Sequence, residues 1–320
     1  MQRALSGLCK NVFYRFVGVV RVAVPSALQS AVWLIKIIIP VSLIVTLLSF
    51  FGIVGYIAEF LNPVFGLLGL PGEASLVFIT SIFLNVYSAI AAISQLALSH
   101  REITILLAMC LIAHNLFVET MVQVKTGSKA WHIVFLRISM AIFLGFALNW
   151  LMPDGAGGEI QISRSAAAAD FTTTLVSWAE SSFFFSLKII ALVLLLMVLQ
   201  QLLKEFGVIK ILSTMLSPFL KVLGLPQSTS FLWIIANTLG LTYGSAAILQ
   251  EVESGAVTRR DADLLNFHIA VSHSNLEDML LLGAIGVSAA WVLIPRLAIA
   301  TFVVWGRRLV STKYPVSSAF

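Results

Sequence analysis

Two short stretches of the chain place polar and ionisable side chains inside otherwise apolar segments. The first contains His114, Asn115 and Glu119, and the second reads SHSNLED from Ser272 to Asp278. A charged side chain at the centre of a bilayer costs about 2.5–3.5 kcal/mol on insertion scales, so such groups require a partner or a function. Glu119 paired with an acid of the second stretch could bind a cation or carry a proton, and histidines change charge near neutral pH.

The composition shows why these groups must be considered at membrane depth. Of the 320 residues, 59% are hydrophobic and 11% are charged, whereas soluble domains carry about 25% charged residues. Apolar runs near the roughly 17–25 residues that cross a bilayer recur from about residue 28 to about residue 306. The net charge of +5 is explained by basic loops that orient membrane helices, so no nucleic-acid partner is expected. The sequence predicts a multi-pass protein of a bacterial inner membrane.

The chain contains two related copies of one unit. LNPVFGLLGLP at residues 61–71 matches LSPFLKVLGLP at residues 216–226, and AAISQ at 91–95 matches AAILQ at 246–250 at the same offset of 155 residues. Further along, His114 pairs with His273 and Arg137 with Arg296, and upstream Lys36 pairs with Lys188. Duplicated units in transporters commonly surround a binding site.

These matches predict a division of the chain into five parts. An amphipathic cytoplasmic helix at 1–27 precedes a first repeat at 28–152, and an extracytoplasmic linker at 153–179 leads to a second repeat at 180–308. Residues 309–320 form a cytoplasmic tail. The linker is assigned because residues 153–165 are rich in Gly, Ser and acidic residues.

The distribution of Lys and Arg favours repeats of opposite orientation. If residues 73–98 and 228–252 are re-entrant hairpins, only Arg101 and Arg164 of the basic loop residues fall outside the cell. If both segments cross instead, five lysines move outside: Lys125, Lys129, Lys204, Lys210 and Lys221. A topology in which the next apolar segment of each repeat is re-entrant instead places nearly as many Lys and Arg residues in the cytoplasm. The distribution of basic residues therefore favours inverted repeats without identifying which segment forms the hairpin. The expected fold is all-α, with two inverted repeats of about three transmembrane helices, an interfacial helix and a re-entrant hairpin each.

The proposed hairpins each have two short apolar arms around a polar tip. The first tip is at residues 85–88, with Asn85 and Ser88, and the second is at residues 240–245, with Thr242 and Ser245. Gly, Thr, Ser and Asn allow the chain to reverse, and such a turn is tolerated at membrane depth when it is buried in protein or lines a wet cavity.

The LGLP turns, the AAISQ and AAILQ segments and the central His of each half resemble the Gate, or nucleoside-recognition, family. That family includes bacterial spore-maturation membrane proteins and the pore region of ferrous-iron permeases, and it is similar to the core of concentrative nucleoside transporters. The resemblance covers about residues 30–305 and implies inverted repeats with a hairpin and a broken helix in each. The chain lacks a GxxxxGK[ST] phosphate loop and the nucleoside-binding signatures at the hairpin tips, so no nucleoside specificity is implied.

Inverted symmetry would gather both polar stretches and both tips around one central point. The expected lining of this site is Asn85, Ser88, His114, Asn115, Glu119, Thr242, Ser245, His273, Ser274, Asn275, Glu277 and Asp278. The four basic residues within helices are expected to form structural ion pairs: Lys36, Arg137, Lys188 and Arg296. His268 and His273 are five residues apart and do not share a helix face as a spacing of four would, so no metal site is expected.

The leading hypothesis is a transporter or permease that moves a small polar solute or ion, such as a nucleoside-like solute or a cation, by alternating access around the central site. H⁺ or Na⁺ could couple to it, and no other cofactor is expected. A non-transporting scaffold or regulator of the spore-maturation type and a gated ion pore remain alternatives.

No Ser or Cys nucleophile motif accompanies the His and Asp residues, so an enzyme is not expected. The expected partners are the lipid bilayer and the solute, with a homo-oligomer left open and both termini in the cytoplasm.

Overall fold

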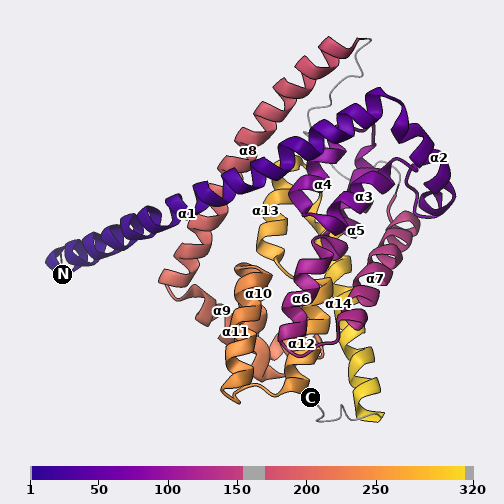
Figure 1. Ribbon diagram of the computed structural model, residues 1–320. Helices are drawn as coiled ribbons and strands as arrows, with labels where there is room; N and C mark the ends of the chain where they lie inside the picture. The colour runs from indigo at the N-terminus through magenta and orange to yellow at the C-terminus, as the bar shows by residue number, and fades with distance from the viewer. Residues whose placement is uncertain (1, 154–169, 314–320) are drawn as a thin grey trace.

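The computed structural model describes residues 2–153 and 170–313, and this part of the chain is helical without strands (Figure 1). The helices of the first half are α1 (Gln2–Phe50), α2 (Ile53–Gly66), α3 (Ala74–Phe83), α4 (Val86–Ile93), α5 (His100–Ala113), α6 (Leu116–Lys125) and α7 (Ala130–Leu151). Those of the second half are α8 (Phe171–Glu205), α9 (Val208–Val222), the 3₁₀ turn η1 (Gln227–Thr229), α10 (Ser230–Thr238), α11 (Leu241–Glu253), α12 (Arg259–Val271), α13 (Asn275–Ile285) and α14 (Ala289–Lys313). The two halves therefore have the same order of elements.

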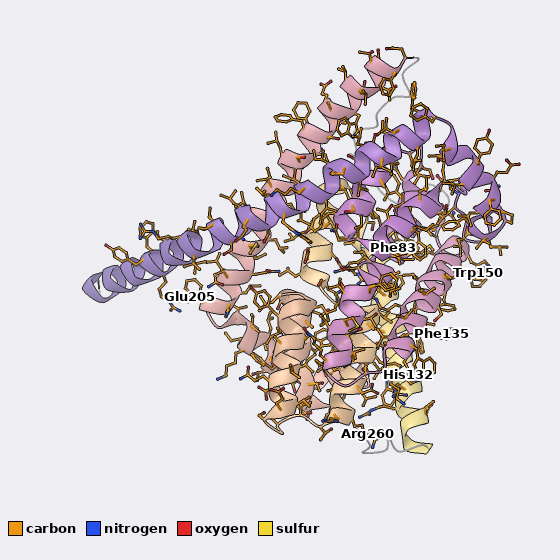
Figure 2. The ribbon with its side chains drawn as sticks, viewed as in Figure 1. Phe83, His132, Phe135, Trp150, Glu205 and Arg260 are labelled. Atoms are coloured by element: carbon orange, nitrogen blue, oxygen red, sulfur yellow. The ribbon has the colours of Figure 1, made fainter. Side chains whose placement is uncertain are left out.

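Five helical stretches of the described chain are long and apolar enough to cross a bilayer. They are Phe13–Phe50, His100–Lys125, Ala130–Leu151, Phe171–Glu205 and Ala289–Val310. Large apolar side chains project from their outer sides: Phe135 is 71% exposed and Trp150 is 83% exposed on α7 (Figure 2). Such surfaces require an apolar solvent, so the chain is a multi-pass membrane protein.

Helix boundaries differ from the expected divisions in three places. The separate helix expected at 1–27 is continuous with the first spanning helix, because α1 runs unbroken from Gln2 to Phe50 with Pro25 and Pro40 inside it. Part of the expected linker is helical, since α8 begins at Phe171 after a cap in which the Asp170 side chain accepts a hydrogen bond from the Thr173 amide. The expected tail is helical as far as Lys313, and residues 154–169 and 314–320 lie outside the described part.

Each half contains a hairpin of two short helices at the expected place. Helices α3 and α4 pack together and reverse at Asn85, which caps α4 by accepting a hydrogen bond from the Ser88 amide. Helices α10 and α11 pack together and reverse at Gly240, whose φ of +87° is strained for other residues. Figure 1 shows the first hairpin with α2 in the upper part of the molecule and the second hairpin with α9 in the lower part.

The LGLP motifs end the helices that precede the hairpins. Gly69 has a φ of +68° and Gly224 one of +75°, which is the left-handed conformation that follows many helix C-termini. The next amide reaches back to a carbonyl in each case, Leu70 to Phe65 at 3.0 Å and Leu225 to Leu220 at 2.8 Å. The repeated motif is therefore explained by chain reversal before the hairpin, and it carries no ligand chemistry of its own.

The centre of the bundle is formed by α5 and α12. Residues 103–113 of α5 are all buried, and so are residues 264–271 of α12. A helix that is apolar and buried on all sides lies in the interior of a bundle, here between the hairpins and the long outer helices. Both central helices end at the polar stretches, so the core positions these groups.

Candidate functional site

The polar stretches interrupt the helical ladder at equivalent points. Between α5 and α6 the chain breaks at His114 and Asn115, and between α12 and α13 it breaks at residues 272–274. Asn115 and Ser274 have φ values of 48° and 55°, and they are the only non-glycine residues with positive φ in the described chain. Their amides donate to the hairpins, Asn115 to the Ser81 carbonyl at 2.8 Å and Ser274 to the Ala236 carbonyl at 3.0 Å. The hairpins thus satisfy backbone groups that the breaks leave open.

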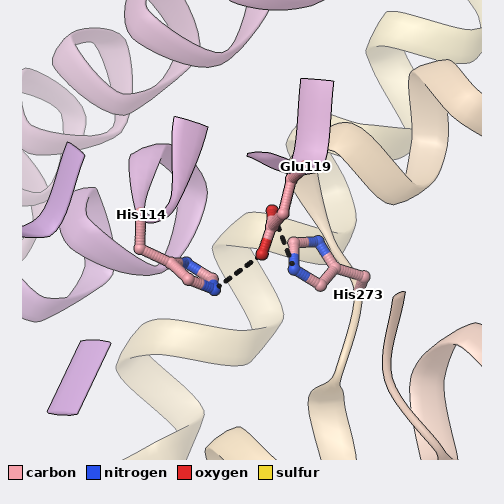
Figure 3. Close-up of side chains that lie close together, drawn as sticks. All are labelled: His114, Glu119 and His273. Carbon is pink, nitrogen blue, oxygen red and sulfur yellow. Dashed lines mark ion pairs between the residues drawn. The ribbon is translucent and has the colours of Figure 1, made fainter. Parts of the chain in front are cut away.

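Three titratable side chains meet where the two breaks face each other (Figure 3). The Glu119 carboxylate lies between two imidazoles, with Oε1 3.2 Å from His114 Nε2 and Oε2 3.4 Å from His273 Nε2. The side chains of His114 and Glu119 are 11% exposed and that of His273 is 1% exposed. We call His114, Glu119 and His273 the central cluster. It joins the two halves, because Glu119 and His273 belong to different repeats.

Two buried arginines donate hydrogen bonds to backbone carbonyls at the helix breaks. Arg137 donates to the carbonyls of Ile112 and His114 at 2.6 and 2.7 Å, and its Nη2 lies 2.7 Å from Glu119 Oε2. At the equivalent place, Arg296 donates to the carbonyls of Val271 and His273 at 3.3 and 3.4 Å and forms an ion pair with Asp278. Helix breaks leave carbonyls without partners, and a guanidinium supplies several donors in a fixed geometry.

The four expected ion-pairing residues separate into two groups. Arg137 and Arg296 are fully buried and paired with Glu119 and Asp278. Lys36 and Lys188 are exposed on α1 and α8, and among the described residues no ion pair involves Lys36. Exposed lysines with long flexible side chains can reach the polar edge of a membrane, so a buried acid is not required at Lys36.

The remaining expected site residues lie around the central cluster in smaller groups. Glu277 accepts a hydrogen bond of 2.7 Å from the Tyr87 hydroxyl, which links α13 to the first hairpin. Asn275 donates to Asn237 Oδ1 at 2.7 Å, within the second half. No described contact joins a carboxylate pair of the expected kind, since Glu119 and Asp278 each face a different arginine.

The hydrogen bonds described for the first tip do not reach the cluster. Asn85 and Ser88 bond to each other within the first tip. Ser245 is buried in α11, and the side chain of Thr242 lies outside the described residues. Thr242 and Ser245 belong to the first turns of α11 and the reversal itself is at Gly240, so the second tip is shorter than expected.

Sequence reasoning missed a second polar connection between the halves. The Asn266 amide on α12 donates to Thr126 Oγ1 at 2.8 Å and to Ser128 Oγ at 3.0 Å, and Gln123 donates to the Asn266 carbonyl at 3.2 Å. Ser128 also donates to Asp263, which is paired with Arg307. Only a polar residue in the middle of a buried helix, Asn266, pointed to this network. These hydrogen bonds join α6 and the loop between α6 and α7, in the first half, to α12 in the second half.

A small polar-edged pocket lies between the halves on another side. It has a volume of about 40 Å³ and is bordered by α1 and α4 of the first half and by α8 and α13 of the second. Ser42, Ser94, Ser182 and Lys188 give it a polar wall among apolar neighbours. Ser42 also accepts a hydrogen bond from the Trp178 indole at 3.1 Å. Space with polar lining at an interface between the halves could admit water or an ion.

Comparison with known proteins places this architecture in a family. The model of the Gate family, described as nucleoside recognition, matches residues 31–129. The chain is also similar to the uncharacterized membrane protein YvoD of Bacillus subtilis (strain 168), with 32% identity over 268 residues that cover 83% of this chain and 86% of the relative. No solved structure matches the chain. The chain belongs to the Gate, or nucleoside-recognition, family of membrane proteins.

Proposed function

We propose that the protein is a bacterial inner-membrane transporter that moves a small polar solute or ion by alternating access around the central cluster. The observation that carries the proposal is the position of the cluster: buried titratable groups of both halves meet at two helix breaks. Broken helices around a shared polar centre are the usual construction of substrate sites in secondary transporters.

The charges at this centre favour a cation over a nucleoside-like solute. Glu119 and Asp278 are paired with Arg137 and Arg296, and Glu277 is a third carboxyl that accepts a hydrogen bond from Tyr87. If Glu277 is ionised and the histidines are neutral, the centre carries a net charge of −1, which attracts a cation or a proton. A low-dielectric interior strengthens this attraction.

The arrangement of the halves supports alternating access by inverted repeats. The two hairpins lie toward opposite ends of the molecule in Figure 1, as oppositely oriented repeats would place them. In that arrangement the α12–α13 segment is a sixth crossing and the hairpins are re-entrant. The cluster is closed in this conformation, because its side chains are at most 11% exposed. An ion could therefore enter only if contacts between the halves open, and the Asn266 network is one such contact.

Reconstitution in liposomes tests the proposal. Purified protein is incorporated into vesicles, and uptake of mono- and divalent cations and of nucleosides is measured with and without a pH or sodium gradient. We expect gradient-dependent uptake of a cation that Glu119→Gln and His273→Ala abolish. His268→Ala is the matched control, since His268 is buried in α12, the helix that precedes His273, and accepts a hydrogen bond from Trp233 outside the cluster.

The alternatives give different results in the same experiment. A gated pore would conduct single-channel currents in planar bilayers, and its flux would follow the ion gradient without a coupling ion. A scaffold would move no solute and would tolerate Glu119→Gln and His273→Ala in the cell. If no solute moves and both variants retain the cellular phenotype, the transport proposal is wrong.

A further inference from the structure

We propose that His114, Glu119 and His273 form a binding site for one divalent first-row transition-metal ion. This site is defined by the three side chains of the central cluster and does not require that the ion be transported. That the bound metal is also the transported ion rests on the proposed function.

The donor atoms have the spacing of metal ligands. The three side chains offer ligand atoms that all lie within 4.8 Å of one another. Zinc and similar ions bind His nitrogen and carboxylate oxygen at about 2.0–2.2 Å, so neighbouring ligand atoms of a tetrahedral site are about 3.3–3.5 Å apart. The distances from the Glu119 oxygens to the two imidazole Nε2 atoms are 3.2 and 3.4 Å. Small side-chain adjustments would therefore suffice for an ion to bind all three groups.

The hydrogen bond of His273 prepares its other nitrogen for a metal. His273 Nδ1 lies 2.6 Å from the Ile269 carbonyl oxygen. A carbonyl can only accept, so Nδ1 carries the proton and, in the neutral imidazole, Nε2 presents a lone pair. Metal-binding histidines commonly donate their second nitrogen to a backbone carbonyl in this way, which fixes the tautomer and the ring orientation.

One of these donor atoms, His273 Nε2, lacks a partner without an ion. His273 Nε2 is buried and makes no hydrogen bond within the described chain, and it faces Glu119 Oε2, which is ion-paired with Arg137 at 2.7 Å. A neutral imidazole lone pair facing a carboxylate oxygen is repulsive, and buried polar atoms without partners are costly. Either a proton on His273 or a cation between the two groups removes this cost. His114 Nδ1 also has no hydrogen-bond partner among the described residues.

The choice of donors decides between classes of cation. Mg²⁺ and Ca²⁺ prefer sites built from oxygen atoms. Two imidazoles with one carboxylate suit first-row transition metals such as Zn²⁺, Co²⁺ and Fe²⁺, and a third protein ligand leaves positions open for water. Spacing within one helix could not reveal this site, because its ligands come from α6, α12–α13 and the α5–α6 break.

Cobalt binding to the purified full-length protein tests the site directly. Protein in detergent is stripped with a chelator and titrated with Co²⁺ while the visible spectrum is recorded. We expect one Co²⁺ per chain with the strong ligand-field bands of low coordination number, displacement by Zn²⁺, and no displacement by Mg²⁺. Glu119→Gln and His273→Ala should each lower the affinity by more than about tenfold, since even outer-shell partners change metal affinity by 10–100-fold. His268→Ala should leave it unchanged.

Replacing one ligand by another that also binds the metal gives a positive signal, which a misfolded variant would not show. In His114→Cys, the thiolate is itself a good ligand for Co²⁺ and Zn²⁺, so binding should persist and a sulfur-to-cobalt charge-transfer band should appear in the near ultraviolet. The native Cys110 is buried and lies four residues before His114. The wild-type spectrum is therefore the control, and it must show no such band. Size-exclusion chromatography checks that each variant is monodisperse.

Two outcomes overturn the metal site. One is the absence of stoichiometric Co²⁺ binding to the wild type, which would leave a proton as the occupant of the cluster. The other is binding that Glu119→Gln and His273→Ala do not weaken and that gives no charge-transfer band in His114→Cys. Co²⁺ binding without ion flux in liposomes would retain the metal site and reject the transport function. Cation flux without Co²⁺ binding would retain the transport function and reject the metal site.

Discussion

The Nε2 atom of His273 lies 3.4 Å from Oε2 of Glu119, and this contact crosses from the second repeat to the first. A second crossing contact lies beside it, where Arg296 Nη2 donates to the Leu111 carbonyl at 3.2 Å. The first contact is made at the break before α13, and the second reaches α5 three residues before the break at His114, so the chemistry of the centre and the fit between the halves depend on neighbouring residues. A rearrangement of the halves must change the surroundings of Glu119.

The buried pair of Arg296 with Asp278 should be a major contributor to stability. Arg296→Met leaves Asp278 as an uncompensated buried charge, and we expect a loss of about 3–5 kcal/mol in the free energy of unfolding. Adding Asp278→Leu removes that charge and should restore part of the loss. Denaturant titration in mixed micelles measures the effect.

Arg15→Met is the control for this prediction. Arg15 is paired with Glu205 at 2.9 Å, but both side chains are well exposed, so removing the pair should cost about 1 kcal/mol or less. Equal losses for Arg296→Met and Arg15→Met would contradict a special role of the buried pair.

The positive φ of Ser274 predicts an unusual order of tolerated substitutions. Left-handed backbone costs roughly 1–2 kcal/mol for most residues and least for Gly and Asn. Ser274→Gly, and Ser274→Asn, which copies Asn115 of the other repeat, should be as stable as the wild type. Ser274→Val should lose about 1–2 kcal/mol. Thermal unfolding of the three variants gives the comparison, and equal stability of the Val and Gly variants would show that this conformation is not maintained.

The hydrogen bond from Tyr87 to Glu277 should contribute to the closed conformation. Bonds to charged groups contribute about 1.5–3 kcal/mol, so Tyr87→Phe should lower stability by about that amount and change the rate of uptake in liposomes. Tyr243, at the tip of the other hairpin, is 58% exposed, and Tyr243→Phe should change neither quantity. If both Phe variants behave alike, the bond to Glu277 has no part in closing the halves.

The inverted arrangement predicts where four exposed positions face. In a background without cysteines, Lys129→Cys and Lys210→Cys should react with an impermeant thiol reagent from the cytoplasmic side. Glu59→Cys on α2 and His100→Cys at the start of α5 should react from the outside. Because α2 and α9 are equivalent helices of the two repeats, labelling of Glu59→Cys and Lys210→Cys from the same side would refute inversion.

The sequence alone determined the membrane environment, the duplication and the family. Hydrophobic composition follows directly from contact with lipid, and the LGLP and AAISQ-type matches are local strings that survive in both halves. The polar stretches around His114 and His273 stood out for the same reason, since a charge in an apolar run is visible without coordinates. Apolar arms of half the spanning length also indicated the short hairpins, although the charge distribution left open which segment of each repeat is re-entrant.

Tertiary structure alone decided which polar groups meet. Glu119 was expected beside another carboxylate, but it faces two histidines and Arg137, and Asp278 faces Arg296. The continuity of α1 and the network around Asn266 were likewise not visible in the sequence. The physical reason is that helix periodicity relates residues three or four positions apart, whereas the partners at this centre are joined only by how separate helices pack. A ligand set assembled from both repeats leaves no spacing pattern in either one.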